Sequence, residues 1–380
     1  MSISLVHTAD WQLGKAFGAV GGEAQGRLRD ARFEAVRNVG VLARERRADA
    51  IVVAGDVFDS GTAADPTLRR ALIAMESFAG PWVLLPGNHD PATAEGVWAR
   101  LRRLGLPGNV IVADRPEPVV LAGGRLVVLP APLVRNNETD DLTAWFDTAP
   151  APSGAVRVGL AHGSIPSRLP ADADARNPIA DDRCARAGLD YLALGDWHGT
   201  LRIDARTWYA GTPEPDRAKD NDPGNALLVR FDRVGAEPVI EPVAIGRYRW
   251  HALRRAIHRS ADVAVLTDDL RALDRPLDRP LDRHVVELAL EGTVDFATRA
   301  ALTAALDDLA ARLCDLRVNE GRLAVLHSED DLRQIPATGF VGSALARLRE
   351  AAMGSDAQAG IARRALQILY VECRQPQAGH

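Results

Sequence analysis

The feature that most constrains this chain is a short apolar run, residues 82–85, that stops at a Pro-Gly pair and is followed at once by Asn88, His89 and Asp90. The run predicts a buried strand, and the Pro-Gly pair predicts its end. An amide, an imidazole and a carboxylate at the end of a buried strand are costly to desolvate unless they bind something, such as a cation. We therefore expect buried strands that deliver polar side chains to one edge of a sheet.

The same pattern recurs along the first half of the chain. Apolar runs also stop after residues 6, 54, 160 and 194, and each is soon followed by a carboxylate, an amide or an imidazole. The side chains placed in this way are Asp10, Gln12, Asp56, His162, Asp196 and His198. A single such residue is more often a turn or capping residue than a ligand. Repetition favours a shared site, because ligands of open α/β sheets bind outside the carboxyl ends of the strands.

Helical patterns alternate with these strands. Apolar spacing of three predicts a helix from about residue 30 to residue 47, and the Gly-rich residues 15–30 before it predict an exposed loop. A second helix is expected to begin with Asp65 as its N-cap and Pro66 at the first helical position. Further strands are expected at residues 126–129, 156–160, 190–194, 208–210 and 226–231. The alternation predicts a layered α/β domain.

Length, charge and cysteine content narrow the class of protein. A chain of 380 residues is too long for one small core, so we expect two domains or one domain with an appendage. A net charge of -5 argues against a strongly basic nucleic-acid coat but leaves room for a local basic groove. Three scattered cysteines indicate neither a disulfide framework nor a thiolate zinc site. Without a leader-like or membrane-spanning apolar run, we expect a cytoplasmic protein.

The collected donors suit a pair of divalent metal ions. Carboxylates, imidazoles and amide oxygens without thiolates favour manganese or iron, with magnesium and zinc as open alternatives. The set is too large for one ion with an open position, but sufficient for two ions that share a bridging carboxylate. Two such ions stabilise both the attacking and the leaving oxygen of a phosphoryl displacement. His89 could then protonate the leaving oxygen.

Five motifs in order resemble the signature of the calcineurin-like metallophosphoesterases. They are Asp10-x-Gln12, Gly55-Asp56-x-x-Asp59, Gly87-Asn88-His89-Asp90, Gly-x-x-His162-Gly and Gly195-Asp196-x-His198. The flanking residues around Asp10, Leu192 and Gly211 are similar to those of the SbcD-type DNA repair exonuclease branch. The match spans residues 1–235 and implies a layered sheet sandwich flanked by helices, with a small α/β capping domain and a helical tail.

The resemblance also implies a role for each motif residue. Asp56 would bridge both ions, and the remaining ligands would be Asp10, Gln12 and His198 for one ion and Asn88, His162 and Asp196 for the other. His89 would be the acid, and Asp90 would orient it by a hydrogen bond. Asp59 would either support Asp56 or cap local backbone.

Two positions depart from the family pattern. The family usually has His at the positions of Gln12 and Asp196. A glutamine can still ligate through its neutral carbonyl oxygen, though more weakly than imidazole, unless it faces solvent. Asp196 brings a third carboxylate to the two ions and so favours manganese or iron.

Beyond residue 235 the sequence is less informative. Residues 236–249 read as an extended connector, and residues 236–327 resemble the capping domain, with a strand at 285–290, a helix at 295–313 and a strand near Leu323. A Leu-Asp-Arg-Pro repeat between residues 273 and 284 predicts an extended, turn-rich segment. The tail, residues 328–380, begins a helix near Ser328 and predicts two amphipathic helices. In the resembled branch such a tail docks on a coiled-coil ATPase of the structural-maintenance type; alternatively, it packs on its own cap.

These observations predict a manganese-dependent phosphodiesterase that acts on DNA as an exonuclease or endonuclease in repair. Rim arginines such as Arg27, Arg32 and Arg217 could neutralise a DNA backbone, although scattered arginines are usually solvated surface. The alternatives are a phosphatase or phosphodiesterase for small or cyclic nucleotides, and a non-catalytic scaffold for the ATPase. The expected partners are DNA and that ATPase, and a homodimer is compatible with the sequence.

Overall fold

The computed structural model describes residues 2–168, 176–273, 280–326, 333, 335, 338–354 and 356–374. The chain divides into two compact units, Met1–Arg249 and Trp250–His380. The division into three parts at residues 235 and 327 stays a prediction. Residues 274–279 of the Leu-Asp-Arg-Pro repeat and the helix start expected at Ser328 lie outside the described residues.

The first unit contains two six-stranded sheets. The first has the order β12-β11-β1-β2-β3-β4, with β1 (Ile3–Thr8), β2 (Ala50–Val53), β3 (Trp82–Leu84), β4 (Val110–Val112), β11 (Asn225–Phe231) and β12 (Val239–Ala244). The second has the order β5-β6-β7-β8-β10-β9, with β5 (Val119–Leu121), β6 (Leu126–Ala131), β7 (Val156–His162), β8 (Tyr191–Gly195), β9 (Leu201–Arg202) and β10 (Thr207–Tyr209). Strands β1 to β4 are parallel, and so are β6, β7, β8 and β10, so each set ends at one edge of its sheet.

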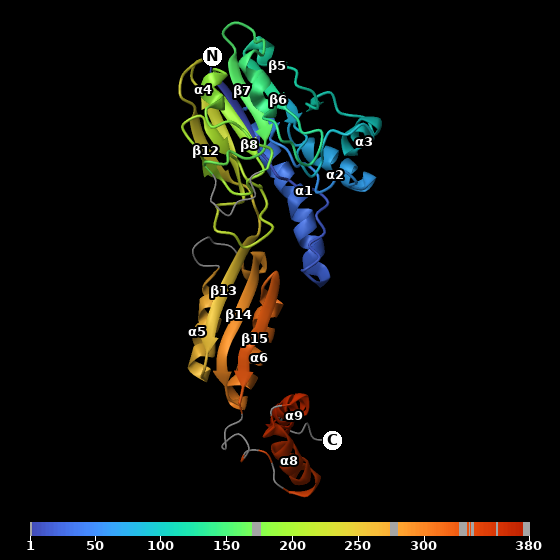
Figure 1. Ribbon diagram of the computed structural model, residues 1–380, viewed down its shortest axis with the longest axis vertical. Helices are drawn as coiled ribbons and strands as arrows, with labels where there is room; N and C mark the ends of the chain where they lie inside the picture. Colours follow the sequence, from blue (N-terminus) through green and yellow to red (C-terminus); the bar gives the residue numbers. More distant parts are fainter. Residues whose placement is uncertain are drawn as a thin grey trace. The chain divides into compact units, whose positions relative to one another are not determined.

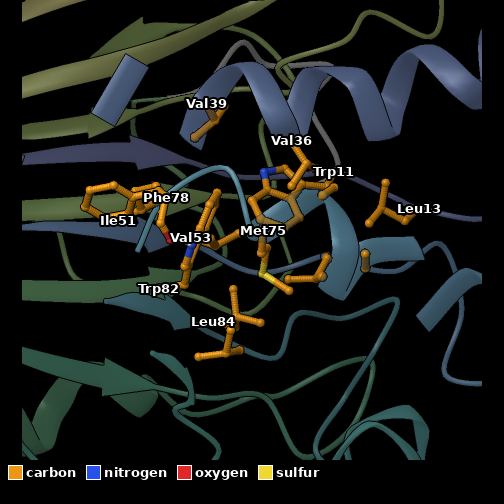
Figure 2. Packing of buried hydrophobic residues seen from close by; sticks show 14 of the residues in the cluster. Trp11, Leu13, Val36, Val39, Ile51, Val53, Met75, Phe78, Trp82 and Leu84 are labelled. Carbon is orange, nitrogen blue, oxygen red and sulfur yellow. Dashed lines mark hydrogen bonds between the residues drawn. The ribbon is translucent and has the colours of Figure 1, made fainter. Parts of the chain in front are cut away.

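Three apolar layers hold these sheets together. Strand residues that alternate in direction form one core between the sheets, with Leu5, Val83 and Leu160 fully buried. Helices α1 (Gly22–Glu45), α2 (Asp65–Met75) and α3 (Val97–Arg103) lie on the outer face of the first sheet (Figure 1). Figure 2 shows Val36 and Val39 of α1 pointing toward the strands in this layer. The short helices η2 (Leu142–Asp147) and α4 (Arg183–Arg186) cover the second sheet.

Three details of the first unit differ from expectation. Helix α1 begins at Gly22, so the second half of the expected loop 15–30 is helical, because Ala24 and Leu28 pack into the core. Ala64 is the N-cap of α2, and Asp65 is its first residue, whose carboxylate pairs with Arg100 on α3. The expected connector 236–249 contains β12, which pairs antiparallel with β11.

The second unit is a small α/β layer followed by two helices. Its sheet has the order β13-β14-β15, with β13 (Arg249–Ile257), β14 (His284–Val294) and β15 (Asp315–Val325), and η4 (Leu281–Arg283) precedes β14. Helices α5 (Ser260–Arg271) and α6 (Phe296–Arg312) pack on one face of the sheet. Strand β14, helix α6 and strand β15 confirm the elements predicted at these positions, whereas β13 and α5 were not predicted.

The two predicted tail helices are α8 (Gly339–Ala352) and α9 (Ala357–Arg374), which pack on each other. Tyr370 of α9 also contacts Phe296 of α6, with ring centroids 5.5 Å apart. The tail therefore packs in part on its own cap, which was one of the two sequence expectations. In the described part of the chain, none of the helices combines the length and apolar character that crossing a bilayer requires.

Candidate metal centre

The structure brings the predicted donors together at the carboxyl ends of strands from both sheets. Asp10 follows β1, Asp56 follows β2, and His162 ends β7. Donor atoms of these three buried residues all lie within 4.8 Å of one another. Asn88, after β3, places Oδ1 2.7 Å from Nε2 of His162, and Oδ1 of Asp196, after β8, lies 3.8 Å from the same nitrogen. The five side chains thus converge on one small volume.

The backbone is held in an unusual conformation at this site. Asp10, Gln12, Asp56 and Asp196 have φ of 53°, 42°, 52° and 97°, which is the left-handed region that non-glycine residues rarely adopt. Each such residue costs on the order of 1–3 kcal/mol, and such strain clusters at functional sites. The turns after β1 and β2 stabilise each other, because the amide of Gln12 donates to the carbonyl of Asp56 over 2.9 Å.

Two motif glycines allow the turns to approach this closely. A Cβ at Gly87 would lie 2.3 Å from Oδ1 of Asp56, and one at Gly195 would lie 1.9 Å from the carbonyl oxygen of Ala54. Both positions are therefore restricted to glycine by packing against the neighbouring strand end. Because Gly195 ends strand β8 of the second sheet and Ala54 directly follows strand β2 of the first, this contact joins the two halves of the site.

The surrounding carboxylates stabilise positive charge on His162. Its Nδ1 lies 2.8 Å from the carbonyl oxygen of Ala54, which can only accept, so Nδ1 carries a proton. Its Nε2 then faces oxygen acceptors, among them Oδ1 of Asp56 at 3.5 Å. Burial lowers the pKa of His162, but the charges of Asp56, Asp10 and Asp196 outweigh burial and raise the pKa to about 9. A cation among these oxygens removes the need for an imidazolium.

The donor set fits a divalent cation. Oδ2 of Asp10 is buried without a hydrogen-bond partner among the described residues, which is costly for a carboxylate oxygen unless it binds a cation. Burial also raises the pKa of Asp10 to about 6, and the charges of Asp56 and Asp196 add to this rise. Its other oxygen accepts from the amide of Asp196 over 3.1 Å. Oxygen and imidazole donors without thiolate are typical ligands of manganese, iron and magnesium.

His89 lies at the exposed edge of these donors. Its side chain is 42% exposed, and Nε2 lies 3.9 Å from Oδ2 of Asp56. Its Nδ1 contacts the backbone carbonyl of Asp59 at 3.0 Å, so Nδ1 donates and Nε2 faces the site. The expectation that Asp90 orients His89 by a hydrogen bond is therefore wrong. The carboxylate of Asp90 accepts from the backbone amides of Gly87 and Phe58, and so holds the turns that carry His89 and Asp56.

Gln12 is buried next to His198, but its carbonyl oxygen contacts another side chain. Oε1 accepts a hydrogen bond from Nζ of Lys15 over 3.1 Å, and Nε2 lies 3.3 Å from Nε2 of His198. Gln12 is 1% exposed, so the alternative in which it faces solvent is wrong. Its role as a metal ligand stays a prediction.

Sequence reasoning missed Asp216, which lies directly behind His198. Its Oδ2 is 2.9 Å from Nζ of Lys15, 3.4 Å from Nη2 of Arg32 and 3.7 Å from Nδ1 of His198. Burial would raise the pKa of Asp216, but hydrogen bonding to His198 and the charges of Arg32 and Lys15 hold it well below its usual range. Arg32, expected at the rim, is fully buried. The available signal was that Asp216 follows strand β10, as the other donors follow theirs.

Comparisons with known proteins identify relatives of this chain. A model of the calcineurin-like phosphoesterase family matches residues 3–200. The SbcD chain of the nuclease SbcCD from Rhodobacter capsulatus is 28% identical over 89% of this chain and 94% of that protein. The DNA double-strand break repair protein Mre11 from Aeropyrum pernix is 30% identical over 64% of this chain and 61% of that protein.

Among solved structures, the chain is similar to TT1561 of Thermus thermophilus, with a TM-score of 0.40 and 14% identity over 64% of this chain and all of that chain. The family model matches more than half of the chain, in the unit that holds the donors. The chain therefore belongs to the calcineurin-like phosphoesterase family, with SbcD and Mre11 proteins among its relatives.

Proposed function

We propose that this chain is a metal-dependent phosphodiesterase that hydrolyses DNA, as an exonuclease or endonuclease in repair. The observation that carries the proposal is the convergence of buried carboxylate, amide and imidazole donors from separate strand ends beside the exposed His89. The nuclease and repair names of the relatives favour DNA over small or cyclic nucleotides. The cytoplasmic location expected from the sequence stays a prediction.

For the two metal ions, we propose the ligands that the family pattern implies. Asp56 would be shared, with Asp10, Gln12 and His198 on one side and Asn88, His162 and Asp196 on the other. With metal ions bound, preferably manganese, such a site would polarise the phosphate oxygens and activate a water molecule.

His89 is the residue that we assign to proton transfer. Because the carbonyl of Asp59 holds Nδ1, the ring presents Nε2 toward the phosphate that the donors would bind. A protonated Nε2 can give its proton to the leaving oxygen as the phosphorus–oxygen bond breaks. Asp90 acts through the backbone, by holding the turn from which His89 projects.

A substrate panel with added manganese tests the proposal. Labelled single- and double-stranded oligonucleotides, cyclic nucleotides and a generic phosphodiester are compared, with bound metal measured in parallel. We expect cleavage of DNA, and we expect His89→Ala to lower the rate about 100-fold or more while the metal remains bound. His258→Ala removes an exposed histidine from the second unit and is the matched control, which should cleave like the parent.

Each other outcome identifies a different function. Turnover of cyclic nucleotides alone would assign the chain to small substrates. Bound metal without turnover of any substrate would support the non-catalytic scaffold. Parental cleavage by His89→Ala would refute the assigned role of His89.

We also propose that the tail docks on a coiled-coil ATPase. Phe340 of α8 and Ile361 of α9 are 87% and 61% exposed, although both are large and apolar, and Met353 and Ile368 are exposed as well. Co-purification with an ATPase of this class should be lost in Phe340→Ser combined with Ile361→Ser. A double variant that still co-purifies would refute the docking site.

A further inference from the structure

We propose that the two ion positions of this chain are unequal, because Lys15 holds Gln12 turned away from one of them. In this arrangement the side with Asn88 and Asp196 binds its ion tightly, and the side with Gln12 and His198 binds its ion weakly. The inference rests on the metal-dependent function proposed above, but its test counts bound ions and does not depend on DNA cleavage.

Lys15 determines which way the Gln12 amide faces. An ammonium group has only donors, so the atom that it contacts at 3.1 Å must be the carbonyl oxygen of Gln12. The amide nitrogen is thereby directed to Nε2 of His198, at 3.3 Å. An amide nitrogen can only donate, so the lone pair of His198 Nε2 accepts its hydrogen. Both atoms that a cation would need, the carbonyl oxygen of Gln12 and Nε2 of His198, are thus already occupied by hydrogen bonds.

A buried ionic cluster keeps Lys15 in this place. Its ammonium lies 2.9 Å from Oδ2 of Asp216, whose side chain is only 2% exposed. Asp216 also contacts Arg32 and Arg217. Because a buried carboxylate that loses partners is destabilised, Lys15 is held more firmly than a surface lysine. The same carboxylate lies 3.7 Å from Nδ1 of His198, so Asp216 positions both side chains.

The charges around the two ion positions also favour tighter binding on the side with Asn88 and Asp196. The Gln12 side has a neutral amide where the family has an imidazole, a fixed ammonium, and a guanidinium nitrogen of Arg217 3.1 Å from Nδ1 of His198. The other side gains the carboxylate of Asp196, which Ser164 holds through a 2.9 Å hydrogen bond. The carboxylate of Asp216 offsets part of the positive charge on the first side, so a divalent ion is attracted there less strongly than beside Asp196. Lys15 is therefore a positioning residue that sets the affinity of one ion.

Titration of the metal-free full-length chain with Mn²⁺ tests the inference. Calorimetry gives the two dissociation constants, and the electron paramagnetic resonance signal of free Mn²⁺ gives the number bound. We expect one ion to bind at least about tenfold more tightly than the other. Lys15→Met should tighten the weaker ion about tenfold and leave the tighter ion unchanged.

Three further variants keep the test sharp. Lys219→Met is the matched control, since it removes the same charge from an exposed lysine that rests on the ring of Trp197, and it should change neither constant. Gln12→His restores an imidazole and should also tighten the weaker ion. Asp196→Asn should weaken the tighter one. If Lys15→Met does not fold, Gln12→His decides the matter.

Two results would overturn the inference. One is a parent chain that binds two ions with equal affinity. The other is a folded Lys15→Met or Gln12→His in which the weaker constant is unchanged. If the parent binds two equal ions and still cleaves DNA, the inference alone fails. If it binds no Mn²⁺, the proposed function fails with it.

Discussion

Replacement of Arg32 by methionine should reveal how much the buried ionic cluster contributes to stability. Arg32 is buried, donates to the carbonyl of Trp11 and lies 3.4 Å from Asp216. Methionine keeps most of the apolar stem but removes the charge and the donors. Breaking a buried ion pair costs about 3–5 kcal/mol, because the partner charge stays buried. Lys15 and Arg217 still face Asp216, so we expect the lower end, about 3 kcal/mol.

Urea unfolding followed by tryptophan fluorescence measures this loss. In thermal unfolding, the midpoint temperature should fall by roughly 6–12 °C, since 1 kcal/mol corresponds to about 2–4 °C in a unit of this size. The control is Arg29→Met on the same helix, where the side chain is exposed and donates hydrogen bonds to Gln25, and its cost should stay within about 0.5 kcal/mol.

The pH dependence gives a second measurement of the same effect. Because the pKa of Asp216 is held below its usual range, its ionised form stabilises the fold above the unfolded pKa of about 4. That contribution is lost as the pH falls below this value. The cost of Arg32→Met should therefore be complete at pH 7 and shrink in acid. A cost below about 1 kcal/mol at pH 7, or one that does not depend on pH, would refute the reasoning.

Two further predictions concern metal binding and a second buried carboxylate. Mn²⁺ at 100 times its dissociation constant should stabilise the parent by about 2.7 kcal/mol in thermal or urea unfolding, and Asp56→Asn should lose most of this gain. Burial raises the pKa of Glu214 to about 7, although backbone amides of Arg247 and Tyr248 donate to it. The protonated carboxyl of Glu214 stabilises the fold fully below the unfolded pKa of about 4.5, and this stabilisation is lost as the pH rises toward 7. The free energy of unfolding should therefore fall by about 3 kcal/mol between these pH values, and Glu214→Gln should make it less dependent on pH. Equal stabilisation of parent and Asp56→Asn by Mn²⁺, or equal slopes for parent and Glu214→Gln, would contradict these expectations.

Much of the first unit follows from local patterns. Apolar runs that are soon followed by a carboxylate, an amide or an imidazole identify β1, β2, β3, β7 and β8, and these polar residues lie at the expected strand ends. Where local patterns failed, packing decided the outcome. The Gly-rich start of α1 is helical because Leu28 enters the core, and β12 pairs at a sheet edge although only part of it is covered. Asp90, expected beside the His89 ring, instead binds backbone amides of two turns.

The chain alone determined which residues stand at the strand ends, because that relation is local: a run of apolar residues, a break, and the donors that follow. It could not determine which atom of each donor faces inward. Gln12 and His198 are 186 positions apart, and the orientation of the Gln12 amide depends on Lys15, which depends in turn on Asp216. Only the tertiary structure brings these four side chains into hydrogen-bonding distance, and only at that distance does donor and acceptor chemistry select one arrangement.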